Sequence, residues 1–571
     1  MPTLLPSRLT TVILCSALGF VLACSKVTAE NQCATDDQCS ALLHVRPGTA
    51  ICSGGICIPR CHDCGGEWAP PYEPPDVCES TERCLAEHPG EKWVCQEPGR
   101  QSCVRLTSPE CTEVHGDWER MVPRARPLIV GAIMPLDSKN ADGTVSPSAF
   151  DLSERDAMEL ARSEWQRAVG GLSMGETARQ PFVLVICDSR GESGRVTSAL
   201  SHLKSIGASS VVLRSDDDAS AAAPLLGKLQ IPAVCTHCVS EPSLQSDAAG
   251  FLYRLAPAYG SSIVPLVTRW VRDTETRIRA EGGPIVGQNV RAVYVSPKDP
   301  QSELLEREIV EKLELNGAPV PQPSSDFQYF QVAANIADIT AAIPTLVSQK
   351  PDIILLAGGV ELLVQYIPRI EAAWSPSDRK PRYMLLDPSI DPAAVALAVK
   401  DDEGLRRRIT GFSAYDPKGF EGRYEAFKGR FAEKFQKQPI LGTAYDAFYL
   451  LTEATTAALG DPRTAMETFG GHDVARQVPF VTNRDSSLIV EADPKSIPRT
   501  RELLAGHVSI QARGVFSDFA FDHPKRTQTS DAVVYCPAVN GQGAFGLQPA
   551  MVYRREKKDV EAPFDDSLCG W

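Results

Sequence analysis

Apolar residues from about residue 126 onward fall in short blocks that alternate with amphipathic stretches. Residues 128–133 form a continuous apolar run, which is typical of a strand buried on both faces of a parallel sheet. After it, Ser153 is the expected N-cap of a helix whose apolar residues recur at helical spacing until Gly170 and Gly171 end it. A buried strand followed by such a helix is the first half of a parallel crossover unit.

The same alternation continues along the chain in two series. The first series predicts strands at residues 182–186, 210–213 and 232–235, with helices around 196–203 and 221–229. The second predicts helices around 263–271 and 303–315 and from 361, with strands at 290–295, 352–357 and 383–386. Right-handed crossovers place each series in one doubly wound sheet. We therefore expect an α/β fold with two parallel-sheet lobes.

Cysteines separate an N-terminal segment from these lobes. Eleven of the 18 cysteines lie within residues 33–111, and the five that follow are Cys187, Cys235, Cys238, Cys536 and Cys569. A segment with so many cysteines and few large apolar residues cannot bury enough surface to fold unaided, so we predict a small disulfide-rich module at 33–111. An equal five-residue gap at Cys33 to Cys39 and at Cys78 to Cys84 indicates two degenerate copies of one unit.

The parity of the cysteines adds a constraint. Because eleven and five are both odd, full oxidation requires at least one disulfide between the two regions, or else one free thiol in each. Cys569, near the chain end, is a candidate for reaching back to the module. The pair Cys61 and Cys64 around His62 has zinc-ligand spacing, but a second matching pair is missing, so disulfide bonding is favoured.

The first residues have the pattern of an export signal. Arg8 precedes an apolar stretch at residues 12–23, which is shorter than the roughly 20 residues that span a bilayer. Residues 21–24 resemble the lipobox of bacterial lipoproteins, which implies a signal peptide at 1–23, lipidation of Cys24 and a tether at 24–32. The alternative is ordinary signal cleavage, with Cys24 in a disulfide. With no second spanning run, membrane attachment is expected through lipid alone.

Composition excludes several classes of protein. The 571 residues are 43% hydrophobic and 23% charged, which is ordinary for a globular protein, and the formal net charge is −14. No basic run exceeds the three arginines at 406–408, so the sequence lacks the electrostatic footprint of a nucleic-acid-binding protein. No sequence motif of a hydrolase, a metalloprotease or a phosphate-binding loop is present, and no cofactor or metal is indicated. We expect no enzyme.

The order of these segments resembles the type I periplasmic solute-binding proteins, in the branch that binds leucine, isoleucine and valine for ABC transporters. The matching segments are residues 129–136 (IVGAIMPL), 183–188 (VLVICD), 231–234 (IPAV), 253–257 (YRLAP), 350–359 (KPDIILLAGG) and 444–451 (AYDAFYLL). The resemblance implies a two-lobed binding domain at 126–555, followed by a tail at 556–571. It also implies three chain crossings between the lobes and a ligand cleft between them.

Several site residues follow from this resemblance. Ser240, two residues before Pro242, matches the hydroxyl that holds the ligand carboxylate, and Cys238 a neighbouring backbone contact. Asp387 matches the acid that relatives direct at the ligand ammonium; the alternative is a plain turn at a strand end. Asp217 falls near a small hydroxyl of relatives, although three successive acids at a helix start also suit the helix dipole.

Two departures from the family pattern leave the ligand class open. Asp299 is nearest to the position of a missing family tyrosine, and Val360 replaces a usual aromatic residue. Cys235 and Cys238 at a strand end could also form a redox pair, but Cys187 offers another disulfide partner for them. The resulting hypothesis is a lipid-anchored protein of the cell envelope, in the periplasm or at the cell surface. It captures a small polar solute, such as an amino acid, for an ABC permease. The alternative is a ligand-sensing or scaffold lipoprotein without a transporter.

Overall fold

The computed structural model divides the chain into two units, Met1–Asp76 and Val77–Trp571. The residues that it describes are 50–53, 56–59, 78–95, 103–116, 118, 127–139, 145–173, 179–238, 247, 250–256, 260, 263–282, 289–297, 300–320, 325–332, 336–357, 366–386, 395, 399, 401–413, 417–439, 442–464, 469–523, 525–529, 531–539, 545–555, 557–561, 564 and 569. In the first unit they form the antiparallel hairpin of β1 (Ala50–Ser53) and β2 (Ile56–Pro59).

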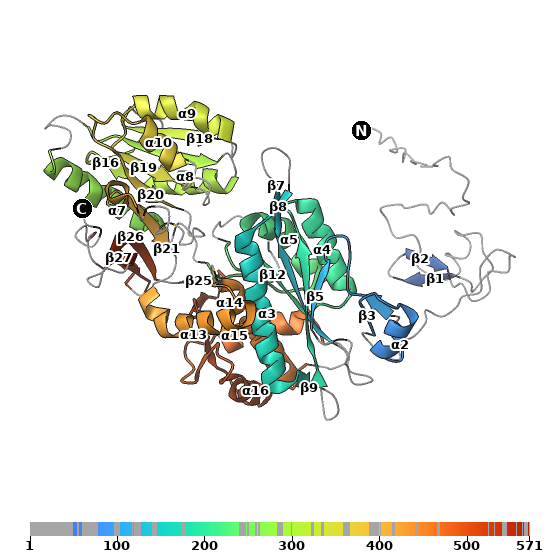
Figure 1. Ribbon diagram of the computed structural model, residues 1–571. Helices are drawn as coiled ribbons and strands as arrows, with labels where there is room; N and C mark the ends of the chain where they lie inside the picture. Colours follow the sequence, from blue (N-terminus) through green and yellow to red (C-terminus); the bar gives the residue numbers. More distant parts are fainter. Residues whose placement is uncertain are drawn as a thin grey trace, which may run out of the picture. The chain divides into compact units, whose positions relative to one another are not determined.

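The second unit contains two lobes, each built on one sheet of eight described strands (Figure 1). Across the sheet of the first lobe, the order is β24 (Phe521–Asp522), β25 (Thr527–Gln528), β14 (Leu252–Arg254), β13 (Ala233–Cys235), β12 (Ser210–Leu213), β6 (Leu128–Met134), β11 (Phe182–Asp188) and β5 (Glu113–His115). The five strands from β14 to β11 are parallel. Four of them, all except β14, correspond to the predicted apolar runs, and every residue of the five strands is buried.

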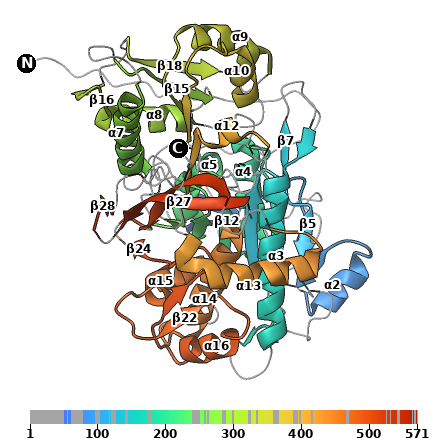
Figure 2. The same ribbon diagram turned by 60° about the vertical axis from the view of Figure 1, so that its left-hand side comes forward.

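Helices of the first lobe cover this sheet. They are α3 (Ala149–Val169), α4 (Ser193–Ser205), α5 (Asp216–Leu229), α13 (Pro417–Phe435), α14 (Thr443–Gly460), α15 (Gly471–Val481) and α16 (Ile497–Ala505). Residues 443–458 of α14 are all buried, and α14 packs against α3, α15 and α16. Figure 2 shows α13 crossing α3. Because α14 is surrounded, its few charged side chains lie in the interior of the lobe.

The second lobe has the same plan. Its sheet order is β18 (Phe327–Val332), β15 (Ala292–Pro297), β19 (Ile353–Leu356), β20 (Arg382–Leu385), β21 (Ile409–Ser413), β26 (Ala532–Val539), β27 (Phe545–Arg554) and β28 (Asp559–Val560). The first five strands are parallel and the last three antiparallel. Its helices are α7 (Val264–Ala280), α8 (Pro300–Lys312), α9 (Ile336–Ser348), α10 (Ile367–Ala373) and α12 (Glu403–Arg406).

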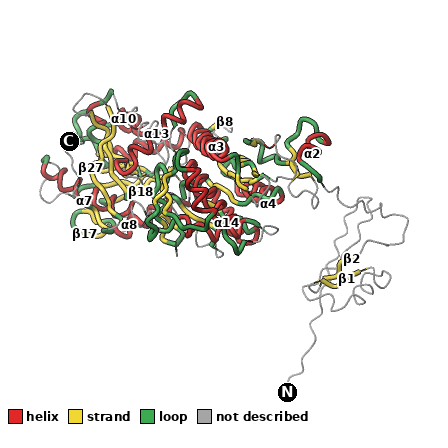
Figure 3. Tube along the Cα trace, turned by 90° about the horizontal axis from the view of Figure 1, so that it is seen from below, coloured by secondary structure: helices red, strands yellow, loops and turns green. Residues whose placement is uncertain are grey.

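Each lobe is therefore discontinuous in sequence. Of the strands in the two large sheets, those between Glu113 and Arg254 belong to the first, those between residues 292 and 413 to the second, those at 521–528 to the first again, and those at 532–560 to the second. The chain crosses between the sheets three times, as the family resemblance implies. Figure 3 shows strands and helices alternating throughout the lobes. The expected α/β class with two largely parallel sheets is confirmed.

Some predicted boundaries were wrong. The first long helix begins at Ala149 and not after Ser153, because Ser148 is the N-cap and its side chain accepts a hydrogen bond from the Asp151 amide. The helix predicted around 303–315 ends at Lys312, and Leu315 lies in a short strand, β16 (Glu314–Leu315), paired with β17 (Ala318–Pro319). Gly170 ends α3 as expected, with a left-handed backbone that glycine adopts without strain.

The remaining short strands form local pairs. They are β7 (Asp137–Lys139) with β8 (Val145–Pro147), β9 (Leu172–Ser173) with β10 (Arg179–Gln180), and β22 (Ile489–Glu491) with β23 (Gln511–Arg513). No helix among the described residues is long and apolar enough to cross a membrane.

The described residues between 78 and 118 pack on the first lobe. Helix α2 (Thr81–Glu87) and the hairpin β3 (Trp93–Cys95) with β4 (Cys103–Arg105) are held by the disulfides Cys78–Cys95 and Cys84–Cys103. Strand β5 then extends the first sheet by pairing antiparallel with β11, and the Leu106 carbonyl lies 3.0 Å from His202 Nε2. The register sets Cys95 opposite Cys103, as the hairpin of the first unit sets Cys52 opposite Cys57.

Disulfides join the cysteine-rich segment to the lobe. Cys111 is bonded to Cys187, which confirms the bridge between the two cysteine regions that parity requires. Cys569 pairs with Cys536 inside the second lobe, so the expectation that it reaches back to the module was wrong. The reason is local, because Cys536 lies on β26, which is packed beside the end of the chain.

We expect loss of the Cys111–Cys187 bridge to loosen residues 78–118 from the first lobe. The cysteines are 76 residues apart, and removing such a cross-link costs about 2–5 kcal/mol. The double variant Cys111→Ser/Cys187→Ser should therefore unfold at lower urea and be cleaved by protease within this segment. The control Cys536→Ser/Cys569→Ser should leave that cleavage unchanged. Equal cleavage in the wild type and the first variant would contradict the expectation.

Candidate functional site

Charged and polar side chains gather at the carboxyl edge of the first sheet. They come from the start of α3, from the residues after β11, β12 and β13, and from the start of α14. In an open parallel sheet this edge is where ligands bind, because strand ends and helix N-termini present unpaired polar groups there. The cluster consists of Phe150, Asp151, Glu154, Ser189, Arg214, Ser215, Asp218, His237 and Thr443. We call it the edge cluster.

Arg214 is the cation of the edge cluster. It follows β12 directly, and its Nε lies 2.7 Å from Asp151 Oδ1, with both side chains about nine-tenths buried (12% and 9% exposed). Its guanidinium carbon lies 4.2 Å from the centre of the Phe150 ring, within the range of a cation–π interaction. The Phe150 ring also meets His237 edge to face at 5.3 Å. Arg214 is therefore held in one orientation by an acid and an aromatic ring.

Glu154 connects α3 to the start of α14. Its side chain is fully buried, and its Oε2 accepts hydrogen bonds from the Thr443 hydroxyl and the Ala444 amide, both at 2.7 Å. Burial raises the pKa of Glu154, against the lowering effect of Thr443, Arg214 and Ala444. Within the described residues, its second oxygen, Oε1, has no hydrogen-bond partner. A buried carboxyl oxygen without a partner is costly, so this atom is available to a ligand or a water molecule.

His237 is neutral in this cluster. Burial, with the neighbouring Arg214, lowers the pKa of His237 well below its usual range. Its Nε2 lies 2.8 Å from the Thr443 hydroxyl, which gives its only proton to Glu154. Nε2 must then carry the proton and donate it to Thr443. His237 thus keeps Nδ1 as a hydrogen-bond acceptor.

Asp218 provides a second buried acid at the start of α5. Ser215, the N-cap of α5, donates its hydroxyl to Asp218 Oδ2 at 3.0 Å and accepts the Asp218 amide. Burial raises the pKa of Asp218 to about 6, against the hydrogen bonds from Ser189 and Ser215. Ser189, Ser215 and Thr443 add three hydroxyl groups to the edge cluster.

The edge cluster can bind both charges of a zwitterion. A guanidinium fixed on an aromatic face suits a carboxylate, and buried acids with raised pKa values gain most from a cation such as an ammonium. The described residues contain no three histidine, cysteine or acidic side chains placed to hold a metal ion. The fixed guanidinium and the buried acids favour a small polar organic solute.

The structure describes two of the residues predicted from sequence to contact ligand. Asp217 is exposed on the first turn of α5, next to the buried Asp216 and Asp218. Cys238 is buried and disulfide-bonded to Cys235, beside His237. Cys187, the other partner considered for these cysteines, is bonded to Cys111. Ser240, Asp299, Asp387 and the lipidation residue Cys24 lie outside the described residues.

Sequence reasoning selected two loops that carry part of the edge cluster but did not select the charged groups in them. Arg214 stands three residues before Asp217, and His237 one residue before Cys238. Their signal was available, since Arg214 directly follows the buried parallel strand β12 and His237 lies two residues after the end of β13. Glu154 and Thr443 had no such signal, because 289 residues separate them in the chain.

Solved structures share this architecture. A branched-chain amino acid transporter substrate-binding protein from Streptococcus pneumoniae, in complex with isoleucine, has a TM-score of 0.50 at 13% identity, covering 74% of this chain and 99% of its own. The fold is that of the type I periplasmic binding proteins. A leucine-, isoleucine-, valine-, threonine- and alanine-binding protein from Brucella ovis has a TM-score of 0.51 at 12% identity, covering 77% and 98%.

A third solved structure of this fold carries a different solute. It is an ABC transporter solute-binding protein from R. palustris in complex with 4-hydroxybenzoate, with a TM-score of 0.50 at 14% identity, covering 78% of this chain and all of its own. Neither a family model nor a curated protein matches this sequence. The type I periplasmic binding fold therefore rests on structure, and at such low identity it establishes architecture alone.

Proposed function

We propose that this protein is a solute-binding protein that captures an amino acid or a related small polar solute between its two lobes. The observation that carries the proposal is the edge cluster, in which Arg214 and buried acids lie together at the carboxyl edge of the first sheet. Solutes of matching chemistry are bound by neighbours of this fold, which carry isoleucine and 4-hydroxybenzoate. Arg214 would pair with the solute carboxylate.

The remaining contacts come from the sequence prediction. Ser240 would add a hydroxyl to the carboxylate site, and the backbone at Cys238 a further contact. Asp387 and Asp299, from the second lobe, would face the cation of the solute. Asp217 would lie at the rim of the binding site. Because these groups belong to different lobes, the solute would touch all of them only in a closed form. Binding would then shift the populations of open and closed forms by its differential affinity.

The closed form would be the state that a transporter recognises. We propose that an ABC-type permease with its ATPase recognises the closed form and imports the solute. The protein would act outside the cytoplasm, in the periplasm or at the cell surface, held to the membrane by lipid on Cys24. Metabolic labelling with a radioactive fatty acid should label the wild type and not Cys24→Ser. Labelling of both proteins would contradict lipidation at this residue.

A thermal-unfolding screen tests solute binding. The chain carrying Cys24→Ser would be heated with single amino acids, amides, small peptides and organic acids. A solute that binds only the folded form raises the unfolding temperature, and more so as its concentration exceeds its dissociation constant. We expect at least one solute to do so, and the rise to disappear in Ser240→Ala and Asp387→Ala. If no compound in the library raises the unfolding temperature, the result would contradict the proposal and favour the sensor or scaffold alternative.

A further inference from the structure

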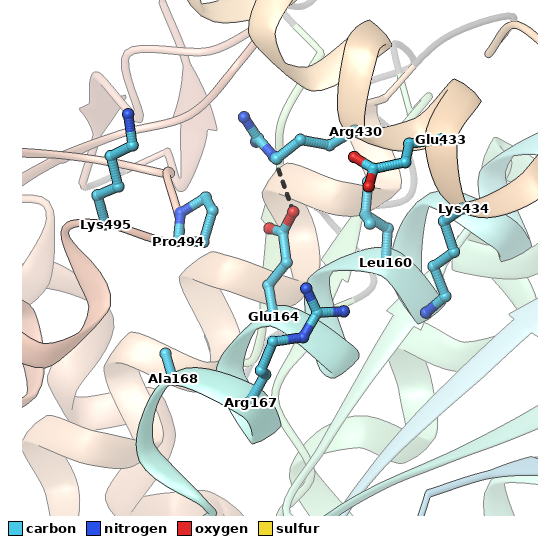
Figure 4. A pocket seen from close by; sticks show the side chains of 9 residues that line it. All are labelled: Leu160, Glu164, Arg167, Ala168, Arg430, Glu433, Lys434, Pro494 and Lys495. Carbon is cyan, nitrogen blue, oxygen red and sulfur yellow. Dashed lines mark hydrogen bonds and ion pairs between the residues drawn. The ribbon is translucent and has the colours of Figure 1, made fainter.

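A pocket with several charged side chains in its lining lies on the first lobe, on the far half of α3 from the edge cluster. Glu154 and Glu164 are ten residues apart on this helix, which corresponds to about 15 Å along its axis. The pocket has a volume of about 460 Å³ and is shown in Figure 4. Its lining residues are Leu160, Glu164, Arg167, Ala168, Arg430, Glu433, Lys434, Pro494 and Lys495. They come from α3, from α13 and from the segment after β22.

The floor of this pocket is built from a fixed hydrogen-bond network. Glu164 is 4% exposed, and its Oε2 accepts the hydroxyls of Tyr445 at 2.5 Å and Tyr449 at 3.0 Å. Its other oxygen, Oε1, accepts Arg430 Nε at 2.8 Å. Arg430 also donates through Nη2 to the Tyr445 oxygen at 3.1 Å. Two tyrosines of the buried helix α14 therefore fix the acid and the arginine before any ligand arrives.

Two further cations at the pocket are not used by the protein itself. Arg167, in the last turn of α3, and Lys495 are exposed. Within the described residues, neither side chain forms a hydrogen bond or an ion pair. Lys434, which donates to Glu159 and Ser163, has a lowered pKa because of burial, and the charges of Arg162 and Arg167 add to this effect. The pocket thus concentrates positive charge.

The charge of the lining contrasts with that of the chain. Four lining residues are cationic and two are acidic, whereas the whole chain carries a formal charge of −14. Arg430 is paired with Glu164 and with Asp493, and Lys434 is paired with Glu159. Arg167 and Lys495 have no partner among the described residues, and cations without a partner work against the compact state unless an anion joins them. The pocket volume is within the roughly 300–1,000 Å³ of small-molecule sites. The two cations without a partner match a ligand with two negative charges.

We propose that this pocket binds a small organic dianion with carboxylate or phosphate groups, contacted by Arg167 and Lys495 beside the fixed Arg430. Arginine and lysine are the residues that recognise both groups, arginine in a bidentate manner and lysine as a point charge. The site is separate from the edge cluster, and its ligand need not be the transported solute. A dianion at this position would hold α3, α13 and the segment after β22 together.

Thermal unfolding of the full chain carrying Cys24→Ser tests this proposal with two probes, succinate and glycerol 3-phosphate. Sodium chloride at equal ionic strength serves as the reference, because it reports general screening of charge. We expect at least one probe to raise the unfolding temperature in a saturable manner. The rise should be lost in Arg167→Gln/Lys495→Gln, whose replaced side chains are exposed. Response to succinate alone or to glycerol 3-phosphate alone would assign the carboxylate or the phosphate class.

Two controls separate this pocket from other effects. The charge-matched variant Arg272→Gln/Lys557→Gln changes exposed residues of the second lobe and should keep the rise. Arg214→Gln should keep it too, which separates the pocket from the edge cluster. No saturable rise with either probe would overturn the proposal. An equal rise in Arg167→Gln/Lys495→Gln would overturn it as well.

Discussion

Replacing Arg214 with glutamine is expected to weaken binding of a carboxylate-bearing solute by about 100-fold. Removing one partner of a buried, hydrogen-bonded charge pair costs about 2–5 kcal/mol, and each 1.4 kcal/mol is tenfold in affinity. Arg214 is the cation of the edge cluster, fixed by Asp151 and by the face of Phe150. Calorimetric titration of the solute found in the thermal screen measures the change in dissociation constant.

A control variant that removes an arginine elsewhere tests whether the effect is specific to Arg214. Arg499 is an exposed arginine on α16, paired only with the exposed Glu502 among the described residues. Arg499→Gln removes the same charge and should bind the solute with unchanged affinity. If Arg214→Gln remains folded, by its unfolding temperature, and still binds like the wild type, Arg214 is not a ligand contact.

Replacing Glu453 with glutamine is expected to stabilise the protein at alkaline pH and not at acidic pH. Glu453 is 1% exposed on α14, and within the described residues its Oε2 has no hydrogen-bond partner. Burial, with the charge of Asp446, raises its pKa to about 8. The folded protein therefore holds a proton that the unfolded chain, with an ordinary pKa near 4.3, releases.

The direction of the pH effect follows from proton linkage. Between the unfolded and folded pKa values the native state binds more protons, so the free energy of unfolding falls as pH rises. The contribution of Glu453 to the free energy of unfolding is fully present below about pH 4 and is lost as the pH rises to about 8. At about 1.4 kcal/mol per pKa unit, the loss between about pH 5 and about pH 8 is on the order of 3 kcal/mol. The glutamine side chain does not titrate, so Glu453→Gln should not show this loss of stability.

Urea unfolding at both pH values measures the effect. Asp446, whose pKa burial raises to about 7, contributes a fall of the same sign, so the readout is the difference between wild type and variant. Glu502→Gln, at a 72% exposed side chain on α16, should show the pH dependence of the wild type. An equal pH dependence in Glu453→Gln and wild type would show that Glu453 does not hold its proton in the folded state.

The sequence predicted the seven strands that carry short apolar runs, and it missed β14, β21 and β26 inside the sheets as well as the strands at the sheet edges. The run that became β6 is apolar throughout because helices cover both sides of a parallel sheet. Strand β18, at the edge of the second sheet, was missed because four of its six residues are half-buried or exposed and such positions tolerate polar side chains. The N-cap was misplaced because Ser148 and Ser153 both precede apolar residues at helical spacing. Only the hydrogen bond to the Asp151 amide distinguishes them.

The candidate site was also predicted only in part. The resemblance selected the loops after β12 and β13, since the order of strands sets which loops meet at one edge. It did not select Arg214, because a hydroxyl residue was expected in that loop and Asp217 stood nearest to its position. The contacts of Glu154 with α14 join segments 289 residues apart, and no local pattern reports such a pairing.

Small-angle X-ray scattering with and without a saturating solute tests most directly whether the two lobes close on it. The solute would be the one that gives the largest rise in unfolding temperature. Closure brings the lobes together, so the radius of gyration of the wild type should fall when the solute is added, while that of Arg214→Gln stays at the unliganded value. A radius of gyration that does not change in the wild type, although calorimetry shows the solute bound, would contradict binding between closing lobes.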